Sequence, residues 1–384
     1  MNAGDDIRGP GLYVHVPFCA RKCTYCYFFS RPDGPDRPRE TERYLETLAA
    51  ELNALPRPFT PASVYLGGGT PTALEPAALG RLLALLRERI DLSRVSEFSC
   101  EANPGTLRNG VLDILRAGGV TRLSIGAQSF HPATLNLLGR IHSAADTVQS
   151  VHEARSAGFD HVSLDLMFAV PGQSLTHWSS DLSQALALGP EHLSLYALTL
   201  EPGTPLAQAV TAGRITSVSD DEAADAYDLA RTALQAAGFE HYEISNFARP
   251  GCACLHNLLY WSGEDYLGAG PAAHSHWKGR RRANAPSLDA WVGRDGPVPF
   301  PCESDECLTP IAKAVETLVF SLRRTRGIQR AEFIQRTGFD LDALRGDTIR
   351  TLLDRGLLDL APPDGIRLAA SALFISDSVF RDLL

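Results

Sequence analysis

The regular alternation of short apolar runs with amphipathic segments, from residue 11 to about residue 200, constrains the fold most. Six runs rich in β-branched and aromatic residues are typical of strands, at 11–16, 62–67, 95–102, 121–126, 161–168 and 192–198. Segments between them have apolar residues at helical spacing, at 39–54, 73–89, 107–117, 143–157 and 175–188. Because parallel strands need right-handed helical crossovers, this pattern predicts an α/β parallel sheet that is doubly wound or curls into a full or partial barrel.

The pattern changes after residue 200. A further helix is expected near 218–237, then a strand-like run at 241–245 and an irregular stretch to about residue 305, rich in Gly, Pro and Arg. Beyond it, the sequence predicts three helices and a β-hairpin, at 308–324, 331–337, 347–356 and 357–369. We therefore expect a large domain over 1–290 and a small helical or winged-helix domain over 305–384.

Composition excludes several classes of protein. The chain has 384 residues, 44% of them hydrophobic and 21% charged, as in an ordinary folded protein with a substantial core. Its net charge of -9 argues against wide nucleic-acid binding, which requires a basic surface. No apolar run reaches membrane-spanning length, and the first residues lack the features of a secretory signal. The sequence therefore predicts a cytoplasmic protein that binds no nucleic acid.

Three of the eight cysteines lie together directly after the first predicted strand. Cys19, Cys23 and Cys26 have C-x3-C-x2-C spacing, which lets one loop surround an inorganic centre. Structural zinc takes four ligands, and no fourth Cys or His follows at suitable spacing. An iron-sulfur cluster held by three thiolates keeps one iron open for another ligand. The alternatives are unrelated buried cysteines or a zinc site, and Cys252 with Cys254 remains a weaker metal pair.

The ends of the next strands carry groups that suit a bound ligand. Gly67-Gly68-Gly69-Thr70-Pro71 follows the second strand, and such a turn lets backbone approach a ligand closely. Glu101, Gln128 and Asp165 follow on the third, fourth and fifth strands. Consecutive parallel strands bring these ends to one edge, where such folds bind ligands. Each residue also has a structural alternative: a helix cap, a loop hydrogen bond or a turn brace.

These motifs resemble the coproporphyrinogen III oxidase-like branch of the radical SAM superfamily, and most closely its HemW subgroup of heme chaperones. The likeness runs through GLYVHVPFCARKCTYC, YLGGGTPT, EANP, LSIGAQSF, LDLMFAVPGQ, YEISNFARPG, HNLLYW and YLGAGPAAHS to SDSVFRDLL, nearly the whole chain. It implies a partial, roughly six-strand barrel with a C-terminal accessory domain. It also implies a [4Fe-4S] cluster on Cys19, Cys23 and Cys26, with S-adenosylmethionine on its open iron. The residues that match family contacts to S-adenosylmethionine are Tyr13, Tyr25, Gly68, Gly69, Thr70, Glu101, Gln128, Arg140 and Asp165.

The resemblance implies heme as a further ligand. His256-Asn257-Leu258-Leu259-Tyr260-Trp261, within 250–284, matches a signature associated with heme binding, so His256 is expected to contact heme. The alternative is a loop histidine bonded to backbone. The basic run of Lys278 and 280–282 would either pair with heme propionates or form ordinary solvated surface. Tyr27 stands where the subgroup usually has Asp. The oxidase has a further cysteine just after the three-cysteine loop, where this chain has Tyr27-Phe28-Phe29.

Three functions follow from this resemblance. The first is a chaperone that delivers heme to acceptor proteins, membrane-bound respiratory enzymes among them. The second is a radical enzyme that oxidises a porphyrinogen propionate or transfers a methyl or methylene group. The third is an enzyme that degrades heme. The oligomeric state stays open, with a homodimer as one option.

Overall fold

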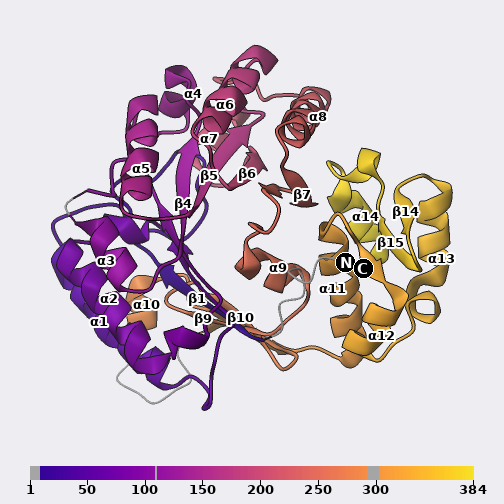
Figure 1. Ribbon diagram of the computed structural model, residues 1–384, viewed down its shortest axis with the longest axis horizontal. Helices are drawn as coiled ribbons and strands as arrows, with labels where there is room; N and C mark the ends of the chain where they lie inside the picture. Colours follow the sequence, from indigo (N-terminus) through magenta and orange to yellow (C-terminus); the bar gives the residue numbers. More distant parts are fainter. Residues whose placement is uncertain (1–8, 109, 293–301) are drawn as a thin grey trace.

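A curled sheet with helices on its outer side forms most of the molecule (Figure 1). The computed structural model describes residues 9–108, 110–292 and 302–384. Six parallel strands lie in sequence order across the sheet: β1 (Gly11–Val16), β2 (Ser63–Gly68), β3 (Glu97–Ala102), β4 (Arg122–Gln128), β5 (His161–Phe168) and β6 (His192–Ala197). All six predicted strands are present, with ends that differ from the expected ones by at most two residues.

The helices that connect these strands cover the convex face of the sheet (Figure 1). They are α1 (Arg37–Asn53), α2 (Pro76–Arg89), α3 (Val111–Ala117), α4 (Pro132–Leu137), α5 (Ala144–Ser156) and α6 (Leu175–Ala187), and α7 (Pro205–Thr211) and α8 (Asp220–Ala236) follow β6. Local sequence fixes several helix starts. Ser143 begins α5 and Ser219 begins α8, each in a reciprocal capping box with an acidic residue three positions later.

The sheet remains open, which confirms the expected partial barrel. Its order is β12-β11-β10-β9-β1-β2-β3-β4-β5-β6-β8-β7, so within the described residues β12 and β7 are unjoined edges. The strand-like run at 241–245 forms β7 (Glu240–Glu243) and turns into β8 (Asn246–Ala248), which pairs antiparallel with β6. None of the helices in the described ranges is long and apolar enough to cross a membrane.

The expectation of an irregular stretch before residue 305 was wrong. This part of the chain forms α9 (Leu255–Trp261), β9 (Tyr266–Ala269), β10 (His274–Trp277), β11 (Arg280–Asn284), α10 (Leu288–Val292) and β12 (Cys302–Cys307). β9 pairs parallel with β1 and extends the barrel sheet. β10 and β11 are short and polar, and antiparallel pairing with β9 and with each other holds them in place where an apolar pattern does not.

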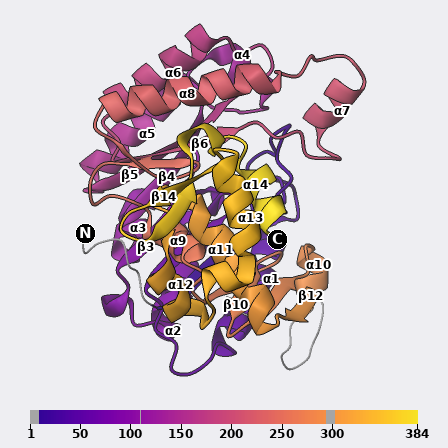
Figure 2. The ribbon, with the colours of Figure 1, turned by 90° about the vertical axis from the view of Figure 1, so that its right-hand side faces the viewer.

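A smaller group of elements follows β12. It contains α11 (Pro310–Arg323), α12 (Arg330–Thr337), α13 (Leu341–Asp354), α14 (Ser376–Leu383) and a sheet of β13 (Ile328–Gln329), β15 (Gly365–Leu368) and β14 (Leu358–Ala361). The expected hairpin is β14 with β15. Figure 2 shows this group in front of the barrel. Phe374 contacts Phe168 and Tyr227, so the group packs on the barrel through aromatic rings.

The two faces of the parallel strands differ in chemistry. Outward residues such as Val14, Leu66 and Leu164 are buried in the main apolar core. Inward residues are polar, and Ser99, Ser124 and Ser163 are buried as well. Because successive residues of a strand face opposite sides, this alternation places a polar chamber inside the curled sheet.

Candidate functional site

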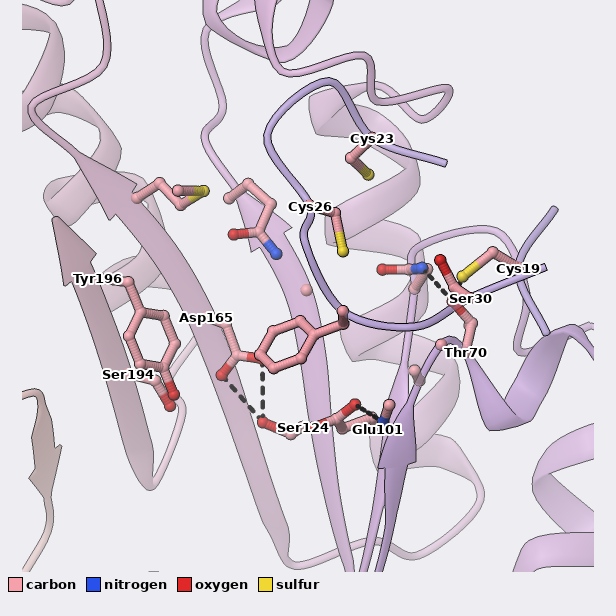
Figure 3. A pocket seen from close by; sticks show the side chains of 18 of the residues that line it. Cys19, Cys23, Cys26, Ser30, Thr70, Glu101, Ser124, Asp165, Ser194 and Tyr196 are labelled. Carbon is pink, nitrogen blue, oxygen red and sulfur yellow. Dashed lines mark hydrogen bonds between the residues drawn. The ribbon is translucent and has the colours of Figure 1, made fainter. Parts of the chain in front are cut away.

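The loop after β1 is held at its base and at its tip. At the base, the backbone N–H of Cys19 donates to the Arg31 carbonyl at 3.0 Å. At the tip, the Thr24 hydroxyl and backbone N–H donate to the carbonyls of Leu137 and Leu138 at 2.7 and 3.1 Å. These contacts fix the loop over the chamber, and the side chains of Cys19, Cys23 and Cys26 line the same cavity (Figure 3).

Two of the three sulfur atoms receive hydrogen bonds from neighbouring loops. The Thr70 hydroxyl donates to Cys19 Sγ at 3.7 Å, and Arg140 Nη1 donates to Cys23 Sγ at 3.4 Å. Burial raises the pKa of the Cys19 thiol and raises the pKa of Cys26 to about 11. A bound metal would replace the thiol protons, and donors beside sulfur stabilise bound thiolates. Within residues 9–108, 110–292 and 302–384, no three His, Cys, Asp or Glu side chains converge on one metal-ion position.

The glycines after β2 are needed by the protein's own packing. Gly68 has a φ of +106°, and a Cβ there would meet the His15 ring at 2.4 Å. A Cβ on Gly69 would meet the Phe18 carbonyl oxygen at 2.7 Å. The sequence interpretation assigned these glycines only to ligand approach. Gly68 and Gly69 do line the cavity, but a larger side chain would first displace His15 or the cysteine loop.

Two half-buried carboxyl groups face the chamber. Glu101 accepts from the Tyr65 hydroxyl at 3.1 Å and from the Gly68 backbone N–H at 3.1 Å. Asp165 accepts from the Ser124 hydroxyl at 2.9 Å (Figure 3). Burial, and then the charge of Asp165, raises the pKa of Glu101 to about 7, and burial also raises the pKa of Asp165. A cation or hydroxyl donor between these groups would favour their ionised forms.

Arg140 is half-buried and is hydrogen bonded within the protein. Its Nη2 donates to the Gly126 carbonyl at 2.7 Å and also to Asn103 Oδ1. Gln128 lies beside it at the end of β4, with a φ of 63° that is uncommon for this residue type. Arg140 therefore organises the rim of the cavity through protein contacts.

The cavity has a volume of about 530 Å³, in the range of small-molecule sites. Eleven of the residues expected at a cofactor site line it: Cys19, Cys23, Tyr25, Cys26, Gly68, Gly69, Thr70, Glu101, Gln128, Arg140 and Asp165. Two acids, sulfur atoms and hydroxyl groups together suit a positively charged ligand with ribose hydroxyls. The residues present therefore fit a sulfonium nucleoside beside an iron-sulfur cluster.

Sequence reasoning missed several lining residues, among them Tyr65, Asn103, Arg122, Ser194 and Tyr196. Most lie on the same inward face as residues that were identified. Ser194, for example, is the register partner of Asp165 on β6. Extending the strand alternation inward from Glu101 and Asp165 would have found them.

Tyr13 and His256 lie outside the residues that line this cavity. The Tyr13 hydroxyl hydrogen bonds His15 Nδ1 at 3.1 Å, and its ring stacks on Tyr65. Tyr65 thus separates Tyr13 from the chamber.

His256 is 1% exposed, and both of its ring nitrogens have partners. Nδ1 bonds Ser63 Oγ at 2.8 Å, and Nε2 bonds the Tyr260 hydroxyl at 2.9 Å. Burial lowers the pKa of His256 to about 4, so the ring is neutral. In this arrangement both ring nitrogens are engaged within the protein, and a heme contact at His256 stays a prediction.

The basic run also has partners within the protein. Arg280 pairs with Asp305 at 2.6 Å, and Arg281 pairs with Glu306 at 3.2 Å and with Glu316. Lys278 lies over the Trp277 ring. These contacts join β11 to β12 and α11, which fits the surface interpretation of this run. The thiols of the possible metal pair have different partners: Cys254 Sγ donates to Glu97 Oε1 at 3.3 Å, and Cys252 Sγ donates to the Pro250 carbonyl.

Comparisons with known proteins agree with this geometry. Residues 13–183 match the Radical SAM superfamily, and residues 308–374 match the HemN C-terminal domain. The fold is similar to that of coproporphyrinogen III oxidase (HemN) from Escherichia coli. That likeness has a TM-score of 0.83 and 23% identity, and covers 98% of this chain and 90% of the other.

Sequence relatives are similar over nearly the whole chain. A Bacillus subtilis protein named heme chaperone HemW is 34% identical over 354 residues, which cover 90% of this chain and 92% of the relative. A Mycobacterium tuberculosis protein of the same name is 35% identical over 377 residues, covering 97% and 94%. The chain therefore belongs to the radical SAM superfamily and, within it, to the family of the HemW proteins.

Proposed function

We propose that Cys19, Cys23 and Cys26 hold a [4Fe-4S] cluster and that S-adenosylmethionine binds its open iron in the cavity. The three thiols on one fixed loop support this assignment, as does Tyr27-Phe28-Phe29 without a further cysteine. When bound and reduced, such a cluster supplies an electron that cleaves the sulfonium and releases a 5'-deoxyadenosyl radical. Membership of the superfamily implies both groups.

The chain's own residues would bind and orient this ligand. Glu101 and Asp165 offer carboxylates to an ammonium group and to ribose hydroxyls, since both line the cavity and accept only hydroxyl and backbone hydrogen bonds there. Gly68 and Gly69 let the turn lie close to the ligand. Thr70 and Arg140 donate hydrogen bonds to the sulfur atoms of Cys19 and Cys23 and so hold the cysteine loop over the cavity.

The wider function we propose is that of a heme chaperone that carries heme to acceptor proteins. The observation that carries this proposal is the likeness, over at least 90% of the chain, to relatives named heme chaperone HemW. Membrane-bound respiratory enzymes are the acceptors that the family resemblance suggests. Radical oxidation of a porphyrinogen is the second reading, and the likeness to the HemN structure supports its fold alone.

An aromatic pair at the cavity mouth fits a flat ligand better than His256 does. Tyr27 and Phe28 line the mouth, and their ring centroids are 4.7 Å apart. They are 60% and 53% exposed although both are large and aromatic. Exposed aromatic faces of this kind stack on planar apolar molecules. We therefore assign the heme contact to this pair.

The test is a heme titration of anaerobically reconstituted protein. Replacing Tyr27 and Phe28 together by Ala should weaken heme affinity by about tenfold or more, with unchanged iron content, because two stacking faces are lost. His256→Ala serves as the matched aromatic control and should keep parental affinity. The opposite result, loss only in His256→Ala, would return the heme site to the α9 segment.

A parallel assay separates the chaperone from the enzyme. The parent protein is incubated with coproporphyrinogen III, S-adenosylmethionine and a reductant, and separately with heme and an apo-acceptor. Heme transfer without decarboxylation is expected. Multiple-turnover decarboxylation would contradict the chaperone proposal and establish the enzyme reading.

A further inference from the structure

The cavity continues below Glu101 and Asp165 to a floor that the proposed cofactors do not use. Glu101, Ser124, Asp165 and Ser194 form one inward layer of the chamber. Two positions before each of them, the strand places another inward side chain that lines the cavity: Ser99 on β3, Arg122 on β4, Ser163 on β5 and His192 on β6. Two residues of a strand span about 7 Å. The floor therefore lies one layer deeper, on the side away from the cysteine loop.

Arg122 supplies a buried cation at this floor. Its side chain is only 5% exposed. Nη1 donates to the Cys252 carbonyl at 3.0 Å and lies 3.7 Å from Glu97 Oε2. Nη2 is buried and has no hydrogen-bond partner among the residues that the structure describes. A buried guanidinium with an unmet donor is costly unless an acceptor binds it.

Glu97 is already engaged by other groups. Its Oε2 accepts from the Leu255 backbone N–H at 3.0 Å. Its Oε1 accepts from the His256 N–H at 3.2 Å, and also from the Cys254 thiol and the Ser99 hydroxyl. Glu97 therefore caps the start of α9, and turning toward Arg122 would break those bonds. Asp165 is held one layer higher by Ser124.

The other polar groups at the floor are hydrogen bonded to one another. The Ser163 hydroxyl bonds His192 Nδ1 at 2.7 Å, and His192 Nε2 bonds the Tyr242 hydroxyl at 2.7 Å. This row of hydrogen-bonded side chains is neutral, since burial lowers the pKa of His192 well below its usual value. Arg122 is thus the one positive group on the floor residues described above.

We propose that the chamber floor is a carboxylate site in which Arg122 Nη2 binds the anion beside the Ser163 hydroxyl. Guanidinium groups bind carboxylates through charge-assisted hydrogen bonds, and a dry site strengthens them. The carboxylate is that of a free small acid or the propionate arm of a porphyrin. The site is distinct from the residues assigned to the cluster and to S-adenosylmethionine.

Sodium propionate is the first probe. Its binding to the full chain with reconstituted cluster is measured by saturation-transfer NMR, for the parent, for Arg122→Gln and for Arg21→Gln. Arg21 is an exposed arginine at the cavity mouth and provides the matched control. We expect the dissociation constant to rise at least about tenfold in Arg122→Gln and to stay unchanged in Arg21→Gln.

A second variant guards against misfolding, because Arg122 also contacts Glu97. Arg122→Lys keeps the positive charge beside Glu97 and removes the second guanidinium nitrogen, so a several-fold loss of affinity is expected with a parental unfolding midpoint. Parental affinity in this variant, or no saturable propionate binding by the parent protein, would overturn the proposal.

The source of the carboxylate is read from two further probes, coproporphyrin III and its tetramethyl ester. If coproporphyrin III binding depends on Arg122 and ester binding does not, the floor takes the arm of a porphyrin. If only propionate binding depends on Arg122, the floor takes a free small acid.

Discussion

Two regions of the molecule contain the same kinds of polar side chain: the barrel edge below the cysteine loop, and the α9 segment. They differ in how fully those side chains are hydrogen bonded within the protein. At the edge, Glu101 and Asp165 are half-buried, and desolvation raises the pKa of each. In α9, His256 has a partner on each ring nitrogen, and Glu97 caps the helix start. Carboxyl groups with raised pKa values thus indicate a site for a cationic ligand, whereas a ring with a hydrogen-bond partner on each nitrogen indicates a structural role.

The largest expected effect lies at the edge. Replacing Cys19, Cys23 and Cys26 together by Ala should remove all cluster iron and the broad visible absorbance that comes with it, because no other thiols line the loop side of the cavity. The fold should persist, since the core lies on the opposite face of the strands. Iron and sulfide analysis after anaerobic reconstitution checks this, with Cys252→Ala as control. Parental iron content in the triple variant would rule out these ligands.

The next largest effect is a loss of stability when His256 in α9 is replaced. His256→Ala should lower the free energy of unfolding by about 3 kcal/mol, because a buried ring is lost and Ser63 and Tyr260 lose a partner. Denaturant unfolding measures this change, with the exposed His274→Ala as the matched variant. A His256→Ala protein as stable as the parent would show that α9 is not the satisfied region described above.

The glycine turn belongs to both regions, since it lines the cavity and packs on β1. Gly68→Ala should cost about 2 kcal/mol of stability, because alanine is strained at a φ of +106° and its Cβ would contact the His15 ring. Gly34→Ala has open space at its Cβ and provides the control. If Gly68→Ala weakens ligand binding without any loss of stability, the turn serves the ligand alone.

The smallest effect concerns the protonation of Glu101. Its pKa of about 7 in the free protein means that the carboxyl is largely protonated at pH 6 and ionised at pH 8. A positively charged ligand favours the ionised form, so S-adenosylmethionine affinity should rise with pH through 7, by up to about tenfold. Calorimetry on the reconstituted protein measures it. Glu101→Gln should flatten this dependence, and an equally steep profile in that variant would assign it to another group.

Much of the fold was predictable because its signal is local. In the six parallel strands and their helices, apolar residues recur at regular spacing, so the ends of these elements could be predicted to within a few residues. β9 to β12 were missed, since β12 reads CESDEC and is exposed along its length; only pairing with β11 makes it a strand. Such pairing is a tertiary property that no short window of sequence contains.

The site divides in the same way. The cysteine loop and the polar strand ends could be found because parallel topology brings strand ends together. The hydrogen-bond partners of His256 could not be predicted, because Ser63 lies 193 residues away on β2. Arg122 was also missed, since it stands at the beginning of its strand and reaches the chamber from below.

The central claim is that the cavity presents S-adenosylmethionine to an open iron of a three-cysteine cluster. Electron paramagnetic resonance of the reduced, reconstituted protein, recorded with and without S-adenosylmethionine, tests it most directly. We expect a [4Fe-4S]⁺ signal whose g-values shift when S-adenosylmethionine is added, and a smaller shift at equal concentration in Glu101→Gln. A cluster signal that S-adenosylmethionine leaves unchanged in the parent protein would contradict it.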